Sequence, residues 1–431
     1  MSERAGFATR TLHAGQVPDP ATGARAPPIH QTTSYVFDDA DHAASLYALE
    51  AEGDVYSRIS NPTTRVLEAR LADLEGGVDA VATASGLAAF DATTSVLADV
   101  GDNVVSSSAI YGGTTTYLTH TARHRGIEAR FVEPLDYDAY AERIDGDTAF
   151  VHVETIGNPS LVTPDLERVA EVAHAADVPL VVDNTFATPA LCRPLEHGAD
   201  VVWESTTKWI HGAGTTVGGI VVDGGSFPWG DHPERYPEVG GPNPAFHGVT
   251  FAERFGDRAF AQAVRHRAVR SIGHAQSPFD AWQTVQGLET LPLRMARHCE
   301  NAQAVAEFLA KHDAVEWVTY PGLDVHPTHD EAGEYLDGGY GGMIAFGPAG
   351  GYEAARELCV AVELASFLAN VGDAKTLVIH PASTTHAQLT EAEQRASGVT
   401  PDLVRLSVGI EDAEDIVADL DQALGAVAGG A

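Results

Sequence analysis

The chain has 431 residues, of which 44% are hydrophobic and 20% charged, values typical of a globular protein with two or three domains. Acidic residues number 61 and basic residues 26, so the formal net charge is −35. Nucleic acids and anionic membrane surfaces are therefore excluded as partners, because both would be repelled by that charge.

Only three of the basic residues are lysines: Lys208, Lys311 and Lys375. A surface rich in Asp and Glu and almost free of Lys stays hydrated in concentrated salt, where self-repulsion is screened. We interpret the composition as adaptation to a salty cytoplasm. A single acidic docking face is the alternative, but the acidic residues are spread along the entire chain, which favours the first interpretation.

The three cysteines, Cys192, Cys299 and Cys359, lie far apart and form no C-x-x-C pair. This spacing argues against a zinc ribbon and a disulfide framework, and it indicates a reducing compartment. The amino-terminal residues lack the apolar core of a signal peptide, and no run approaches the roughly 18 apolar residues of a membrane span. We therefore expect a soluble cytoplasmic protein.

Residues 1–62 are rich in Pro, Gly, Thr and Asp with little periodicity, which predicts an extended arm. From about Thr63 short apolar runs alternate with helical stretches at 86–100 and 165–178. The predicted strands are VDAVATAS (78–85), NVVSSS (103–108), TAFVHVET (148–155), PLVVDNTF (179–186), ADVVWEST (199–206) and GTTVGGIVVDGG (214–225). This alternation predicts an α/β domain with a mostly parallel sheet covered on both faces.

The stretch 224–248 is rich in Pro, Gly and aromatic residues and predicts a long ordered loop. Helical patterns over 277–312, strand-like runs at 341–347 and 403–410, and a last helix over 414–428 predict a smaller α+β domain. The expected organisation is an arm (1–62), a large domain (63–265) and a small carboxyl-terminal domain (266–431).

Several stock motifs can be set aside. HGAGTTVGG is rich in glycine, but it is neither G-x-G-x-x-G nor a Walker loop, and it leads into a strand rather than a helix. His120 and His124 are four residues apart without an acidic partner placed for a metal site, so we interpret them as solvated and predict no metal site.

The informative segment is ADVVWESTTKWIHGAG (199–214), in which Lys208 follows the carboxyl end of a predicted strand. Schiff-base chemistry needs a lysine that can lose its proton, and arginine cannot replace it because arginine stays charged. In a chain that uses almost no lysine, this position indicates a nucleophile. The alternative is a surface lysine without a role.

Three further features point to pyridoxal phosphate (PLP). Asp183 ends a buried strand and could bind a protonated pyridine nitrogen, although Asp is also common in turns. Ser85 and Gly86 lie at a strand-to-helix turn, where backbone N–H groups could bind a phosphate, although Ser85 could simply cap the helix. Tyr111 could stack on the cofactor ring or pack in the core. Together they specify one cofactor better than each does alone.

With these motifs the chain resembles the Cys/Met-metabolism family of PLP enzymes, from about Thr9 to its end. The matching stretches are YSRISNPT, TASGLAAF, AIYGGT, ETIGNPS, VVDNTF, ESTTKWIHGAGTTVGG, QGLETLPLRM, NVGDAKTLVIHPASTTH and VRLSVGIED. The resemblance implies the type I aminotransferase-like fold, consistent with the α/β prediction above, and it implies PLP as the cofactor.

The resemblance also implies roles for individual residues. Lys208 would bond covalently to the cofactor and then move protons, Asp183 would pair with the pyridine nitrogen, and Tyr111 would stack on the ring. The other implied contacts are Asn158 to the 3′ oxygen, Gly86, Leu87, Ser205 and Thr207 (with Ser85 at the turn) to the phosphate, Tyr56 and Arg58 to the phosphate of a neighbouring subunit, and Arg405 to the substrate α-carboxylate. A structural salt bridge is the alternative for Arg405.

Two positions depart from the family pattern. Leu87 replaces a common Met or Gln, and Glu204 stands beside Ser205 where His is common. Strand alternation puts Glu204 on the face opposite Ser205, so we expect it to point away from the phosphate.

The implied reaction is γ-replacement, in which O-acetyl-L-homoserine and sulfide, or another thiol, give L-homocysteine and acetate. The alternatives are a cystathionine γ-synthase, a γ-lyase, an O-succinylhomoserine sulfhydrylase, or a PLP-binding scaffold without turnover. The loop 370–386 and the insertion 226–248 favour the sulfhydrylase. The resemblance also implies a homotetramer built from dimers with shared active sites.

The charge balance gives a first test. We expect the activity and the melting temperature to fall when salt is removed, because the repulsion among 61 acidic side chains is then unscreened. Thermal melting and turnover across a salt series measure this dependence, and indifference to salt would refute the halophilic interpretation.

Overall fold

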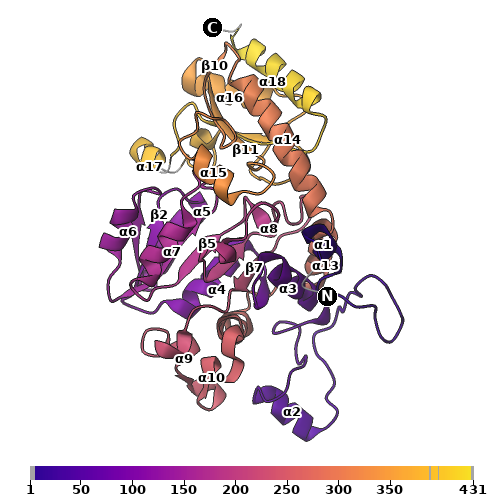
Figure 1. The fold of residues 1–431 in the computed structure, drawn as a ribbon. Helices are drawn as coiled ribbons and strands as arrows, with labels where there is room; N and C mark the ends of the chain where they lie inside the picture. Colours follow the sequence, from indigo (N-terminus) through magenta and orange to yellow (C-terminus); the bar gives the residue numbers. More distant parts are fainter. Residues whose placement is uncertain (1–4, 388–389, 397, 429–431) are drawn as a thin grey trace.

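The computed structural model describes residues 5–387, 390–396 and 398–428, and two sheets organise it (Figure 1). The large sheet has seven strands in the order β1-β7-β6-β5-β4-β2-β3. Its strands are β1 (Asp79–Thr83), β2 (Asn103–Ser107), β3 (Glu128–Val132), β4 (Thr148–Glu154), β5 (Leu180–Asp183), β6 (Val201–Glu204) and β7 (Gly219–Asp223).

In the large sheet β7 runs antiparallel to both β1 and β6, and every other neighbouring pair is parallel. This confirms the predicted α/β class with a mostly parallel sheet. All six predicted strands form. The sequence prediction missed β3, because its run EARFV alternates charged and apolar residues at the half-buried edge of the sheet.

The helices fall into longer and shorter groups. The longer helices are α3 (Pro62–Glu75), α4 (Gly86–Leu97), α7 (Leu166–His174), α13 (Pro278–Leu288), α14 (Leu291–Leu309), α16 (Gly351–Ala361) and α18 (Ala413–Ala428). The shorter α-helices are α1 (Phe7–His13), α2 (Ala40–Tyr47), α5 (Gly112–Thr116), α6 (Tyr137–Arg143), α8 (Thr188–Leu191), α9 (Pro237–Gly240), α10 (Phe251–Phe255), α11 (Ala259–Ala263), α12 (Arg270–Ile272), α15 (His329–Tyr335) and α17 (Glu391–Ala396).

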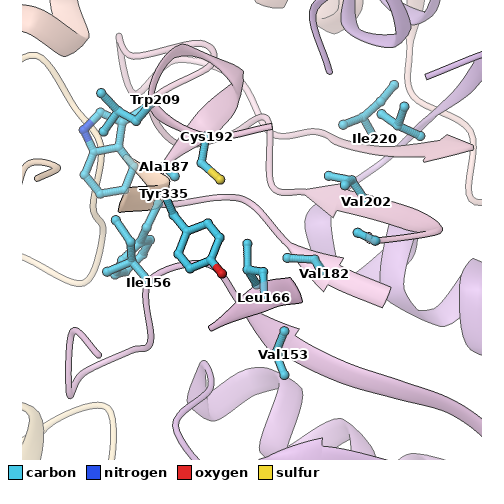
Figure 2. Close-up of a cluster of buried hydrophobic side chains, with 14 of the residues drawn as sticks. Val153, Ile156, Leu166, Val182, Ala187, Cys192, Val202, Trp209, Ile220 and Tyr335 are labelled. Atoms are coloured by element: carbon cyan, nitrogen blue, oxygen red, sulfur yellow. The ribbon is translucent and has the colours of Figure 1, made fainter. Parts of the chain in front are cut away.

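Both faces of the large sheet are buried. Figure 2 shows part of one face, where Val153, Val182, Val202 and Ile220 come from four neighbouring strands. Helices α3, α7 and α13 cover this face, and α4 and α11 cover the other. Burying an aliphatic side chain fully stabilises the fold by about 1.5–3 kcal/mol relative to leaving it exposed. The covered sheet is therefore a stable support for the residues at its edge.

The local sequence explains where the helices next to the sheet begin. Ser85 caps α4, its Oγ accepting a hydrogen bond from the N–H of Ala88 at 3.1 Å. Asp165 caps α7 in the same way, through the N–H of Arg168. The apolar face of α7 is buried; its residues are Leu166, Val169, Ala170 and Ala173.

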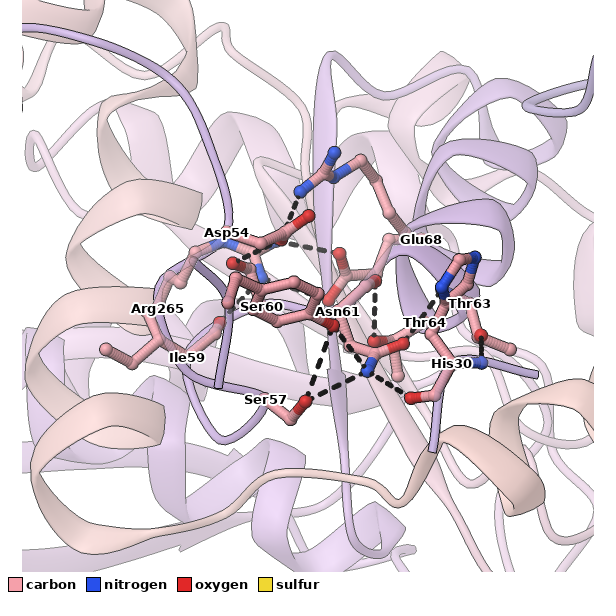
Figure 3. Close-up of polar contacts among 12 residues, drawn as sticks. His30, Asp54, Ser57, Ile59, Ser60, Asn61, Thr63, Thr64, Glu68 and Arg265 are labelled. Carbon is pink, nitrogen blue, oxygen red and sulfur yellow. Dashed lines mark hydrogen bonds and ion pairs between the residues drawn. The ribbon is translucent and has the colours of Figure 1, made fainter. Parts of the chain in front are cut away.

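The sequence predicted an extended arm, but the amino-terminal arm contains two helices, α1 and α2. Helix α1 packs against α3 and α14. Figure 3 shows how the arm is held at its root, where Asn61 donates hydrogen bonds to the carbonyl of His30, the hydroxyl of Tyr35 and the hydroxyl of Ser57, at 2.9–3.0 Å. Asn61 also caps α3, so the arm and this helix share one anchor.

The smaller sheet has five strands in the order β10-β11-β14-β13-β12, and it packs with α14, α16 and α18 in the upper part of Figure 1. Its strands are β10 (Val315–Thr319), β11 (Met343–Pro348), β12 (Ser366–Phe367), β13 (Leu377–Ile379) and β14 (Val404–Ser407). Helix α13 packs against α3, and α14 extends from there to the small sheet. The domain limits given above remain a prediction.

The stretch 224–248 contains short helical turns and the first strand of a two-stranded ribbon, β8 (Pro242–Asn243) with β9 (Val249–Thr250). It buries Trp229, Tyr236 and Phe246 against the α4 side of the large sheet, as expected of an ordered loop. Among the described residues, no helix is both long enough and apolar enough to cross a bilayer.

Candidate active site

The candidate site lies at the carboxyl ends of the parallel strands, the edge where α/β sheets bind ligands. Asp183 is the last residue of β5, and Ser205 directly follows β6. Lys208 comes three residues later, in the loop between β6 and β7. The three positions predicted from sequence are therefore brought to one edge.

Lys208 differs from the other two lysines, because Lys311 and Lys375 are exposed and Lys208 is half-buried. Its Nζ donates a hydrogen bond to Oδ1 of Asn370 at 2.6 Å. Burial, with a smaller contribution from the charge of Arg405, lowers the pKa of Lys208 to about 8. A substantial fraction of this amine is therefore unprotonated at neutral to slightly alkaline pH, as a nucleophile requires.

Asp183 is 6% exposed, and its Oδ1 accepts the N–H of Thr185 at 2.9 Å. Burial raises the pKa of this carboxyl group to about 7. Among the described residues no basic side chain forms an ion pair with it. A protonated ring nitrogen of a bound ligand would supply the missing positive charge.

The start of α4 closely approaches the loop after β6. A Cβ atom at Gly86 would lie 2.7 Å from the Cβ of Ser205, so only glycine permits this approach. Ser85 caps the helix, as the alternative interpretation held, which leaves the N–H groups of Gly86 and Leu87 in the first turn without a helical acceptor. These groups and the hydroxyl of Ser205 suit a phosphate.

Thr207 lies on the same loop as Ser205, two residues later. Its Oγ1 is 3.1 Å from both the carbonyl and the N–H of Gly218 in the segment leading to β7. The backbone of Gly218 thus holds the threonine hydroxyl in place.

Arg405 lies on β14 of the small sheet and is 8% exposed. Its Nη1 donates a hydrogen bond to Oδ1 of Asn158 at 3.2 Å. In the part of the chain that the structure describes, no carboxylate forms an ion pair with it, so the alternative of a structural salt bridge is not observed. Burial lowers its pKa to about 10. A buried guanidinium without an anion is a receptor for a ligand carboxylate.

Tyr111 stands at the start of α5 and is 46% exposed. Its phenol acts on Arg405 in the direction that raises the pKa of the guanidinium, so the two side chains lie within electrostatic range of each other. Asn158, in the loop after β4, accepts the hydrogen bond from Arg405 described above. Arg405 in turn acts to lower the pKa of Lys208, so it is the residue that relates this group to the lysine.

Tyr56 and Arg58 are not part of this group in the single chain. Both are exposed on the arm, where the guanidinium of Arg58 lies 5.3 Å from the centre of the Tyr56 ring. Among the described residues, no hydrogen bond or ion pair joins either of them to Lys208 or Ser205. Their proposed contact with the site of a neighbouring subunit remains a prediction.

Glu204 is fully buried and faces Glu75 at the end of α3, away from Ser205. Glu75 accepts a hydrogen bond from Nδ2 of Asn184 at 2.8 Å. Burial and the neighbouring carboxyl group raise the pKa of Glu204 well above its ordinary value, which favours its neutral form. Glu204 thus lies on the face of β6 opposite Ser205, as strand alternation predicted.

Sequence reasoning assigned no role to three residues of this region. Asn370 contacts Lys208, and Glu154 accepts the N–H of Tyr111 at 2.6 Å. A Cβ atom at Gly112 would lie 3.1 Å from Nε2 of His386, which places this histidine beside the start of α5. All three fall inside stretches quoted for the family resemblance, but the stretches alone assign no role to them, because the contacts join distant segments.

Comparison with known proteins decides the family. The model of the "Cys/Met metabolism PLP-dependent enzyme" family matches residues 8–425. The chain belongs to this family. It is therefore a PLP-dependent enzyme, and the residues above fit the cofactor: a buried lysine, a buried unpaired carboxyl group and a helix start shaped around glycine.

Two curated relatives and one solved structure are similar over almost the whole chain. The homocysteine synthase of Schizosaccharomyces pombe is 52% identical, covering 97% of this chain and 98% of the relative. The O-acetyl-L-homoserine sulfhydrylase of Leptospira meyeri is 48% identical, covering 96% of each. A Campylobacter jejuni structure assigned as an O-acetylhomoserine (thiol)-lyase, which contains a pyridoxyl-lysine phosphate, is 38% identical with a TM-score of 0.94 and covers 98% of this chain and 100% of that one.

The Glu75–Glu204 pair gives a pH-dependent prediction. A carboxyl group whose pKa is raised on folding is most favourable at low pH, and it destabilises the fold as pH rises above its unfolded pKa of about 4.3. We expect Glu204→Gln to raise the melting temperature at pH 8, by about 1–3 °C for each kcal/mol gained, and to raise it less at pH 5. Thermal melting of both proteins between pH 5 and pH 8 tests this prediction. A gain in melting temperature that does not depend on pH would contradict the raised pKa of Glu204.

Proposed function

We propose that the protein catalyses γ-replacement, in which O-acetyl-L-homoserine and sulfide give L-homocysteine and acetate. The observation that carries the proposal is the juxtaposition of Lys208, an amine with a lowered pKa, and Arg405, a buried guanidinium without an anion. The first suits proton transfer at Cα of an amino acid, and the second suits its carboxylate. The names of the relatives supply the substrate class.

In this proposal the chain holds PLP through the residues that the sequence singled out. Lys208 would carry it covalently, Asp183 would pair with the ring nitrogen, and Tyr111 would stack on the ring. The remaining contacts are Asn158 to the 3′ oxygen and Gly86, Leu87, Ser205 and Thr207 to the phosphate, with Ser85 capping the helix below. PLP supplies an electron sink that stabilises negative charge at Cα.

The residues of the chain move protons and orient the substrate. Arg405 holds the α-carboxylate through two parallel N–H bonds, which places the Cα–H bond against the amine of Lys208. The amine of Lys208, set free when the substrate amine displaces it from PLP, would take the Cα proton and pass it on, and would then take a Cβ proton as acetate leaves Cγ. Sulfide adds at Cγ, Lys208 returns protons to Cβ and Cα, and homocysteine is released.

The proposal extends to assembly. Tyr56 and Arg58 are exposed on an arm anchored at Asn61, and they would complete the phosphate site of a neighbouring subunit. We propose a catalytic dimer with shared sites and a homotetramer built from such dimers. The three cysteines are free and buried in this chain, which suits the cytoplasm, where disulfides are rare.

The first experiment offers O-acetyl-L-homoserine to the PLP-loaded enzyme in high salt, with sulfide and with cysteine in separate reactions, and identifies the products by mass. We expect homocysteine from sulfide and little cystathionine from cysteine. Cystathionine as the main product would identify a cystathionine γ-synthase. If neither sulfide nor cysteine gave a product, O-acetyl-L-homoserine would not be the substrate. Lys208→Ala is the control, and full turnover by that variant would overturn its catalytic role.

Arg405 is tested separately. Lysine keeps the positive charge of Arg405 but cannot make two parallel bonds to a carboxylate. We expect Arg405→Lys to lower kcat/KM about 10- to 100-fold, mostly through KM, because hydrogen bonds to charged groups contribute about 1.5–3 kcal/mol. Steady-state kinetics and the visible absorbance of bound PLP measure this. Loss of PLP with an unchanged KM would contradict the carboxylate-binding role.

A further inference from the structure

Glu154 is a buried carboxyl group at the candidate site for which the proposed reaction has no use. It is the last residue of β4, and it lies directly opposite Asp183, the last residue of the neighbouring parallel strand β5. The two residues are 5% and 6% exposed. Partners in adjacent strands project to the same face, so two acidic side chains lie together at this edge of the sheet.

These surroundings are unfavourable for the charged form of the Glu154 carboxyl group. Burial and the charge of Asp183 raise its pKa well above the ordinary value, and no basic side chain among the described residues forms an ion pair with it. A second carboxyl group beside Asp183 therefore costs free energy, and a compensating interaction is needed to explain it.

Two backbone N–H groups supply that compensation. Oε1 of Glu154 accepts the N–H of Tyr111 at 2.6 Å, and the nearby N–H of Asn158 acts to lower the pKa of the carboxyl group and so favours its charged form. The first donor stands at the start of α5, in the segment after β2, and the second lies in the loop after β4. One side chain thus joins two segments whose residues face Arg405.

We propose that Glu154 is a positioning residue that holds Tyr111 and Asn158 against the cofactor. It touches neither PLP nor substrate, and it acts through the backbone of two residues that do so in the proposed function. A carboxyl group suits the task because it can accept at both oxygens, whereas an amide has one accepting oxygen and an NH₂ group that would face a donor. The inference rests on the proposed cofactor contacts of these two residues, not on the identity of the substrate.

The experiment compares Glu154→Gln with a matched control, Asp223→Asn. Asp223 is also a buried carboxyl group at a strand end, and it accepts the N–H groups of Gly225 and Ala261 at 2.9 and 2.8 Å. It pairs with Val201 at the opposite end of β6, at the far edge of the sheet from the candidate site. Both variants exchange one acceptor for a donor beside two N–H groups.

The readouts are the dissociation constant of PLP, the visible circular dichroism of the bound cofactor and the melting temperature of the cofactor-free protein. We expect both variants to melt earlier than the native chain. Glu154→Gln alone should weaken PLP binding by about tenfold and reduce the dichroism, because its NH₂ group would face a backbone N–H and a buried unsatisfied donor costs about 1–3 kcal/mol. Glu154→Asp, which keeps the carboxyl group, should recover part of both signals.

Equal PLP affinity and dichroism in Glu154→Gln and the native protein would overturn the proposal, whatever the melting temperatures. So would equal losses in both variants, because the effect would then be general destabilisation. If Glu154→Gln does not fold, Glu154→Asp carries the test through the same readouts. None of these measurements uses substrate, so a failure of the proposed reaction would be seen separately, in the product assay.

Discussion

The candidate site depends on the burial of ionisable groups that have no charged partner in the chain. Asp183 and Arg405 are each almost fully enclosed, and Lys208 is held half-buried between them and Asn370. An unpaired buried charge costs several kcal/mol, so the surrounding fold must supply that free energy. The large sheet, covered on both faces, provides it and also keeps water from these groups.

The buried charges are segregated by the topology. The parallel strands β4 and β5 end in acidic residues, Glu154 and Asp183, so two carboxyl groups gather at one side of the site. The positive groups come from elsewhere, Lys208 from the loop after β6 and Arg405 from β14 of the small sheet. A ligand with a cationic ring nitrogen and an anionic carboxylate matches this separation, and it satisfies charges that the chain leaves unsatisfied.

The features that could be predicted from the sequence are those with a signal in their own segment. Apolar strands and the cap at Ser85 are local patterns, and the structure confirms them. Lys208 stood out because the chain uses almost no lysine. The edge strand β3 and the arm helices were missed, since neither has a continuous apolar run. Glu154 could not be found from its own segment, because its importance arises from a contact with Tyr111, 43 residues earlier.

Helix α3 connects the arm to the candidate site by contacts at its two ends. It begins at Asn61, whose side chain binds three groups of the arm, and it ends at Glu75, which faces Glu204. Glu204 ends β6 and directly precedes Ser205, so the last turn of α3 lies beside the end of the strand from which the lysine loop starts. The apolar face of α3 is packed on the sheet. The root of the arm and the start of the lysine loop are therefore both fixed to one closely packed element.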